Sequence, residues 1–139
     1  MHTLSQSELA PLRKLYDQYG FTYKAGRVIV RENEYSTELY VLLSGSVAFS
    51  IKDPHTGMPR ALRTIHAGQV FGEISCFGGL PRSATAIATE DSTLLRFSRE
   101  TALELVRASP EFAIRVIKTL GDRLRANTEL LVKLWHAAG

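Results

Sequence analysis

Hydrophobic and polar positions change their spacing twice along the chain. Between Ser5 and Tyr19 apolar residues recur three and four positions apart, which predicts a helix with Ser5 or Ser7 as its N-cap. From residue 21 to residue 98, short apolar runs alternate with turn residues. From residue 98 to about residue 136 the helical spacing returns. We therefore expect one domain over residues 1–139, with an N-terminal helix, a β-rich middle and long C-terminal helices.

The middle region predicts a small β-roll, that is, a jelly-roll-like barrel. Turn residues are densest at 44–46 and 53–57. Short, evenly spaced strands are typical of such barrels, so the fold class is mainly β with flanking helices. Six runs have the length and composition of strands: Val28–Val30, Leu39–Leu43, Val47–Ile51, Leu62–Ile65, Thr85–Thr89 and Thr93–Phe97.

The C-terminal region predicts two helices with serine caps. Ser98 begins the first, which ends near Arg107, and Ser109 followed by Pro110 begins a second that runs to about Trp135. The apolar arc of this last helix is longer than a small roll needs to cover, which predicts a homodimer through it, with Gly121 as a flexible point. Its members are Phe112, Val116, Leu120, Leu124, Leu131 and Leu134.

Composition limits the classes of function. Hydrophobic residues make up 45% and charged residues 22% of the chain, and no apolar run approaches the roughly 20 residues of a membrane span. Residues 1–20 lack the layout of a secretory signal, and the single cysteine, Cys76, fits a reducing cytoplasm. The net charge of +3 comes without a basic block, so it does not indicate nonspecific nucleic-acid binding.

Residues 71–86, FGEISCFGGLPRSATA, combine glycines and small residues with one carboxylate and one guanidinium. A short helical turn after Gly72 would offer free N–H groups to an anion. Arg82, held behind Pro81, carries a planar set of donors that matches phosphate oxygens. A carboxylate only accepts hydrogen bonds, so Glu73 suits a ligand hydroxyl. A hydroxyl beside a phosphate describes a ribose phosphate that is held rather than transferred.

This stretch resembles the phosphate-binding cassette of the cyclic nucleotide-binding domain family, whose members include catabolite activators, regulatory subunits of cAMP-dependent protein kinase and cyclic-nucleotide-gated channels. Residues 23–50 are similar to the early strands of that family, including the turn glycine at Gly45. The resemblance covers nearly the whole chain. It implies that Glu73 accepts a hydrogen bond from the ribose 2′-hydroxyl, and that Arg82 pairs with the cyclic phosphate.

The resemblance also names the ligand. Backbone N–H groups of Ser75 and Ser83 are expected to assist Arg82, and a serine rather than a threonine at Ser83 favours cAMP, with cGMP left open because the hydroxyl could hold a guanine amino group. The candidate ligand-binding residues of the cassette are Gly72, Glu73, Ile74, Ser75, Arg82, Ser83 and Ala84.

Two polar residues of the last helix join this set. The stretch around Asn127 and Thr128 resembles the part of the catabolite activator that contacts adenine, with Asn-Thr in place of a hydroxyl pair. Equally, Asn127 would fix the register of a helix pair, and both readings stay open. Trp135 either stacks on the base or closes the apolar end of the helix.

These features favour a non-enzymatic cytoplasmic cAMP sensor that signals through its C-terminal helices and uses no cofactor. The first alternative is a cAMP-responsive transcription factor whose DNA-binding module is not in this chain. The second is a phosphate-processing enzyme, although we find no nucleophile–base pair, paired carboxylates or metal-ligand spacing, and so assign no catalytic or metal residues. For Glu73 and Arg82 the plain alternative is a mutual buried salt bridge, disfavoured because a glycine-rich loop offers it few hydrogen bonds.

Overall fold

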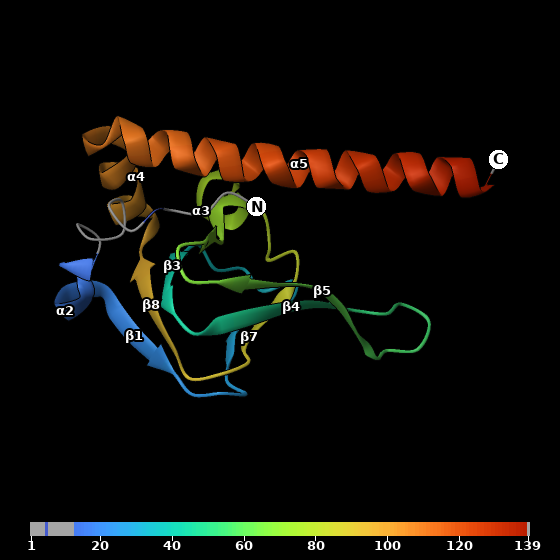
Figure 1. The fold of residues 1–139 in the computed structure, drawn as a ribbon, viewed down its shortest axis with the longest axis horizontal. Coiled ribbons are helices and arrows are strands. Elements are labelled where there is room, and N and C mark those ends of the chain that lie inside the picture. The colour runs from blue at the N-terminus through green and yellow to red at the C-terminus, as the bar shows by residue number, and fades with distance from the viewer. Residues whose placement is uncertain (1–4, 6–12, 139) are drawn as a thin grey trace.

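The computed structural model describes residue 5 and residues 13–138, and it shows the predicted β-roll (Figure 1). Two antiparallel sheets of four strands each form the roll. The first sheet has the order β1 (Gly20–Tyr23), β8 (Ser92–Phe97), β3 (Leu39–Ser44) and β6 (Val70–Phe71). The second has the order β2 (Val28–Val30), β7 (Thr85–Ala88), β4 (Ser46–Lys52) and β5 (Pro59–His66).

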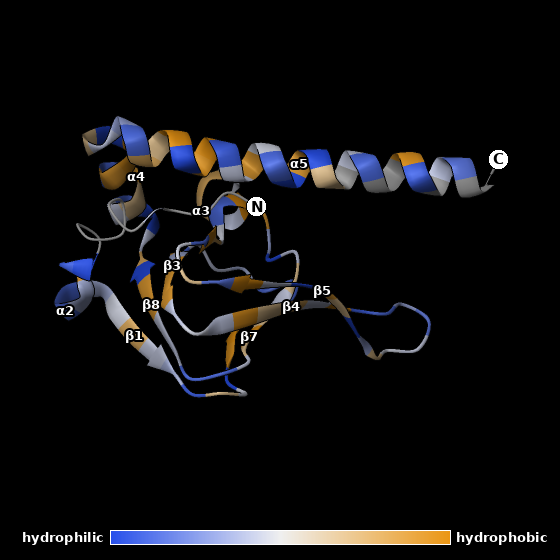
Figure 2. Cartoon of the chain, viewed as in Figure 1, coloured by the Kyte–Doolittle hydropathy of each residue, from blue (hydrophilic) through white to orange (hydrophobic). Residues whose placement is uncertain are grey.

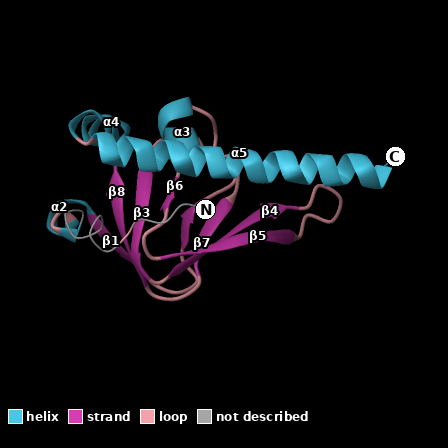
Figure 3. Ribbon diagram, turned by 45° about the horizontal axis from the view of Figure 1, so that its top comes forward, coloured by secondary structure: helices cyan, strands magenta, loops and turns pink. Residues whose placement is uncertain are grey.

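In the part of the chain that the structure describes, four helices flank the roll: α2 (Tyr16–Tyr19), α3 (Glu73–Gly78), α4 (Arg99–Ala108) and α5 (Pro110–Ala138). The serine caps are confirmed, because Ser98 Oγ accepts from the N–H of Thr101 and Ser109 Oγ accepts from the N–H of Phe112, each at 3.2 Å. Figure 3 shows α3, α4 and α5 along one side of the strands, with α2 beside β1. The predicted N-terminal helix is interrupted by a turn at residues 14–15, after which α2 begins. Residues 6–12, with the Ser7 cap, lie outside the described part.

The core consists of two apolar clusters, and β3 contributes to both. Its residues from Leu39 to Leu43 are all buried, which explains the unbroken apolar run in the sequence. Leu39 and Val41 point toward the helices, where they join Phe97 and Phe112. Tyr40 and Leu42 lie on the opposite face, inside the roll. This second cluster includes Phe71, Ala84 and Ala86, and so anchors both ends of the stretch 71–86 inside the roll.

Helix α5 runs unbroken through Gly121, and beside the predicted apolar arc its described side chains form a second apolar face. Phe112 and Val116 are buried against the roll and Leu120 packs beside them, whereas Leu124 is 68% exposed. A second apolar face, with Ile114 and Ile117 half-exposed or more, points away from the roll. Figure 2 shows apolar residues recurring along α5, which extends past the strands (Figure 1).

Cys76 lies on α3 with its side chain fully buried in the core cluster. Desolvation raises the pKa of its thiol to about 11. Because the thiolate is the reactive form, we expect Cys76 to resist thiol reagents at pH 8 in the folded protein. Labelling followed by mass spectrometry should be slow in buffer and fast in denaturant. Rapid labelling of the native protein would contradict this packing.

Candidate functional site

The site forms where β6 ends and α3 begins. Gly72 connects the two with a left-handed φ of 90°. A Cβ atom at this position would lie 2.7 Å from the carbonyl oxygen of Glu38 and 2.8 Å from Nη1 of Arg82, so glycine is the only residue that fits. The backbone therefore approaches Arg82 closely, and it turns Glu73 into the protein interior.

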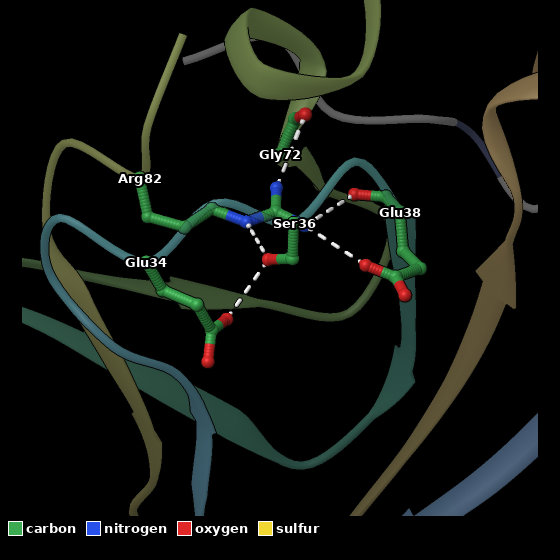
Figure 4. Close-up of polar contacts among 5 residues, drawn as sticks. All are labelled: Glu34, Ser36, Glu38, Gly72 and Arg82. Carbon is green, nitrogen blue, oxygen red and sulfur yellow. Dashed lines mark hydrogen bonds and ion pairs between the residues drawn. The ribbon is translucent and has the colours of Figure 1, made fainter. Parts of the chain in front are cut away.

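Arg82 is 3% exposed and is held by a set of hydrogen bonds drawn in Figure 4. Its Nε donates to Ser36 Oγ at 2.8 Å, and Ser36 Oγ in turn donates to Glu34 at 2.8 Å. Its Nη2 donates to the carbonyl oxygen of Glu38 at 3.0 Å and lies 3.3 Å from the carboxylate of the same residue. Only a long 3.4 Å bond joins Nη1 to the carbonyl oxygen of Gly72. The guanidinium is thus fixed in place while its Nη1 end remains weakly bonded.

Glu73 is fully buried, and its partner comes from the last helix. Its Oε1 forms an ion pair with Nη1 of Arg123, which lies near the middle of α5. Within the described residues, its Oε2 has no hydrogen-bond partner, and neither do Nε and Nη2 of Arg123. Buried polar atoms without partners are uncommon in native proteins. Glu73 therefore retains a buried acceptor that a ligand hydroxyl would satisfy.

Glu73 and Arg82 do not pair with each other in the described structure. Glu73 pairs with Arg123 and Arg82 with Glu38, so the plain alternative of a mutual salt bridge is not what the structure shows. Most hydrogen bonds of the Arg82 side chain come from Ser36 and Glu38, which precede β3 and lie far from residue 82 in the sequence. The glycine-rich loop supplies the long bond to the carbonyl oxygen of Gly72, in line with the expectation that it offers few.

A small cavity lies among these groups, with a volume of about 30 Å³, room for only a few water molecules. The structure brings six of the predicted site residues to its wall: Gly72, Ile74, Ser75, Arg82, Ser83 and Ala84. Five more line it that the sequence did not single out: Val30, Phe49, Arg63, Phe71 and Arg123. In the sequence, Glu73 lies between two residues that line the cavity, Gly72 and Ile74. Because a nucleotide is much larger than this cavity, its binding requires lining side chains to turn aside.

Thr128, one of the two predicted contacts from the far part of α5, does not line this cavity. Thr128 is exposed and its hydroxyl donates to the carbonyl oxygen of Leu124 at 2.9 Å. The side chain of Asn127 lies outside the described residues. Trp135 is 80% exposed. The base-contacting role of Asn127 and Thr128 therefore stays a prediction.

Two searches bear on other kinds of site. Among the described residues, no cluster of three or more His, Cys, Asp or Glu side chains is arranged to hold a metal ion. In the same part of the chain, no helix combines the length and the apolar character needed to cross a membrane.

Comparison with known proteins agrees with this geometry. The cyclic nucleotide-binding domain family matches residues 21–109, so the chain belongs to that family. The cyclic AMP receptor protein of Thermus thermophilus is 36% identical over 109 residues, which cover 78% of this chain and 50% of that protein. Potassium channel KAT2 of Arabidopsis thaliana is 28% identical over 104 residues, 75% of this chain and 15% of the channel.

The fold also matches that of a solved structure. The crystal structure of the Thermus thermophilus catabolite activator protein aligns with a TM-score of 0.80 at 30% identity, covering 96% of this chain and 61% of that one. The described chain thus spans about half of the receptor protein and a smaller share of the channel. The predicted family and the predicted fold are both confirmed.

Proposed function

We propose that this chain is a non-enzymatic regulatory domain that binds a 3′,5′-cyclic nucleotide, cAMP first, in the cavity beside Arg82. One observation supports this above all. Glu73, whose buried Oε2 has no hydrogen-bond partner among the described residues, lies in the sequence between Gly72 and Ile74, which line the same cavity as the fixed guanidinium of Arg82. Such a pair suits a ligand that carries a hydroxyl next to a phosphate. The named relatives, a cyclic AMP receptor and a channel, support a regulatory role.

Thermal unfolding tests this proposal. A ligand that binds only the folded protein adds about 2.7 kcal/mol of stability at a hundred times its Kd. We expect cAMP to raise the melting temperature in a concentration-dependent way. Linear 5′-AMP serves as the control, because its phosphate carries more charge and is not tied to the 3′ oxygen. Equal shifts with both nucleotides, or none with either, would contradict the proposal.

We further propose that two copies of the chain pair through the outward face of α5. Ile114, Ile117, Gly121, Leu124 and Thr128 follow one another at alternating steps of three and four residues, the spacing of a paired helix. Ile117 is 65% exposed, and a Cβ built on Gly121 would meet no atom within 4 Å, so this face is open in one copy. This seam replaces the one predicted from the sequence, because Leu120 packs against its own roll.

Light scattering after size exclusion checks the seam. We expect the wild type to elute as a dimer and the variant Ile117→Lys with Leu124→Lys as a monomer, because charge in an apolar helix seam is unfavourable. Asp122→Lys, an exposed position beside the seam, is the matched control and should stay dimeric. A monomeric wild type would refute the pairing.

The ion pair between Glu73 and Arg123 links the cavity to α5, so ligand binding should change the dynamics of this helix. We expect amide hydrogen exchange in residues 120–135 to slow when cAMP is added, because bound nucleotide favours one position of the helix. Residues 99–108 of α4 provide an internal control. Exchange in 120–135 that does not respond to saturating cAMP would show that the signal leaves by another route.

A further inference from the structure

The carboxylate of Glu38 reaches the guanidinium that is assigned to the phosphate. Glu38 directly precedes β3, and one of its carboxylate oxygens lies 3.3 Å from Nη2 of Arg82 (Figure 4). The side chain of Arg82 is 3% exposed, whereas that of Glu38 is 38% exposed. Arg82 lines the cavity and Glu38 does not. The carboxylate therefore contacts Arg82 from outside the cavity.

This carboxylate is not needed to hold Arg82 in place. Nε of Arg82 donates to Ser36 Oγ at 2.8 Å, and Nη2 donates to the carbonyl oxygen of Glu38 at 3.0 Å. The backbone of Arg82 is fixed as well, since its N–H donates to the carbonyl oxygen of Glu34 at 2.9 Å and its carbonyl oxygen accepts from the N–H of Asn33 at 2.8 Å. All four bonds are independent of the Glu38 carboxylate, so its main contribution at Arg82 is a negative charge.

The carboxylate also takes up donor capacity that a phosphate needs. A guanidinium has five N–H groups. Among the described residues, four acceptors bind them: Ser36 Oγ, the carbonyl oxygens of Glu38 and Gly72, and the carboxylate of Glu38. Two-point binding of a phosphate, the strong geometry for arginine, needs one N–H more than the guanidinium has left. A phosphate that binds Arg82 therefore either displaces the carboxylate or lies beside a second anion.

We propose that Glu38 sets the affinity of the site, because its carboxylate competes with the nucleotide phosphate for Arg82 and so weakens binding. Displacing the carboxylate breaks its ion pair, and retaining it places two anions on one guanidinium, so either route lowers the affinity. This inference rests on the proposed function, since it needs a cyclic nucleotide at Arg82. It concerns the phosphate alone and therefore applies equally to cAMP and cGMP.

Calorimetric titration of Glu38→Gln with cAMP tests the inference. The variant keeps the size of the side chain and the carbonyl oxygen that binds Arg82, but it loses the charge. We expect cAMP to bind about two- to fivefold more tightly, the range expected for a partly exposed ion pair. Glu38→Ala should also bind cAMP more tightly. Glu32→Gln is the matched control, because it removes one charge from the same loop, where its carboxylate accepts from the N–H of Lys52 at 2.7 Å, and it should leave the affinity unchanged.

The gain should not depend on the base, so the ratio of Kd between wild type and Glu38→Gln should be the same for cGMP as for cAMP. It should shrink at high salt, because partly exposed charges are screened. Unchanged or weaker cAMP binding by folded Glu38→Gln, or an equal gain in Glu32→Gln, would overturn the inference and leave the proposed function standing. A wild type that binds neither nucleotide would overturn both.

Discussion

Replacing Arg82 with alanine is expected to lower the affinity for cAMP by about tenfold to a hundredfold or more. The substitution removes a charge-assisted contact to the phosphate, worth about 1.5–3 kcal/mol. Among the described residues, the Nη1 end of Arg82 makes only one long bond, and Arg82 lines the cavity, so it has donor capacity left for a phosphate oxygen. Titration calorimetry on the folded variant measures the loss.

The same substitution should also destabilise the fold. Arg82 is buried, and it bonds both Ser36 and Glu38, so alanine leaves their oxygens without a donor, at a cost of about 1–3 kcal/mol. Arg99→Ala is the matched control, because Arg99 Nε donates to the carbonyl oxygen of Cys76 at 2.7 Å but does not line the cavity. It should lower the melting temperature and leave cAMP affinity unchanged. Unaltered affinity in folded Arg82→Ala would refute the phosphate assignment.

The second large effect is expected for Glu73→Gln, which should weaken cAMP by about tenfold, since a hydrogen bond to a charged group is worth about 1.5–3 kcal/mol. The wild type should bind 2′-deoxy-cAMP with a similar loss. Because both changes remove the same contact, the two losses should not add. A thermodynamic cycle of two proteins and two ligands gives this coupling directly.

A control is needed because Glu73 also pairs with Arg123. Glu34→Gln alters a carboxylate that accepts from Ser36 and does not line the cavity, so it should leave the preference for the ribose hydroxyl intact. If the deoxy ligand loses as much affinity against Glu73→Gln as against the wild type, Glu73 does not contact the 2′-hydroxyl.

Local signals in the sequence predicted most of the fold. The caps at Ser98 and Ser109 act within four residues, and β7 alternates between buried and half-buried residues, so both can be read from short windows. Strand β1 was missed because it follows α2 with no residue between them and has no fully buried residue. Helical spacing showed that α5 is amphipathic, but it does not tell which of two apolar faces meets the roll.

The site was predicted as far as its residues lie together in the chain. The cassette carries its own chemistry within sixteen positions, 71–86, so its members could be named from the sequence. Arg123 is fifty positions after Glu73, and Glu38 is forty-four before Arg82, and an isolated charged residue carries no sign of its distant partner. Arg63 could not be found either, because only the pairing of β4 with β5 places it over Phe49 and on the cavity.

The most direct test of the central claim is a calorimetric titration of the wild-type chain with cAMP, repeated with Arg82→Ala and with 5′-AMP. We expect one saturable site per chain for cAMP, a loss of about tenfold to a hundredfold or more in the variant, and much weaker binding of the linear nucleotide. Binding of cAMP that is equally strong in Arg82→Ala, or no cyclic nucleotide bound by the folded wild type, would contradict the account.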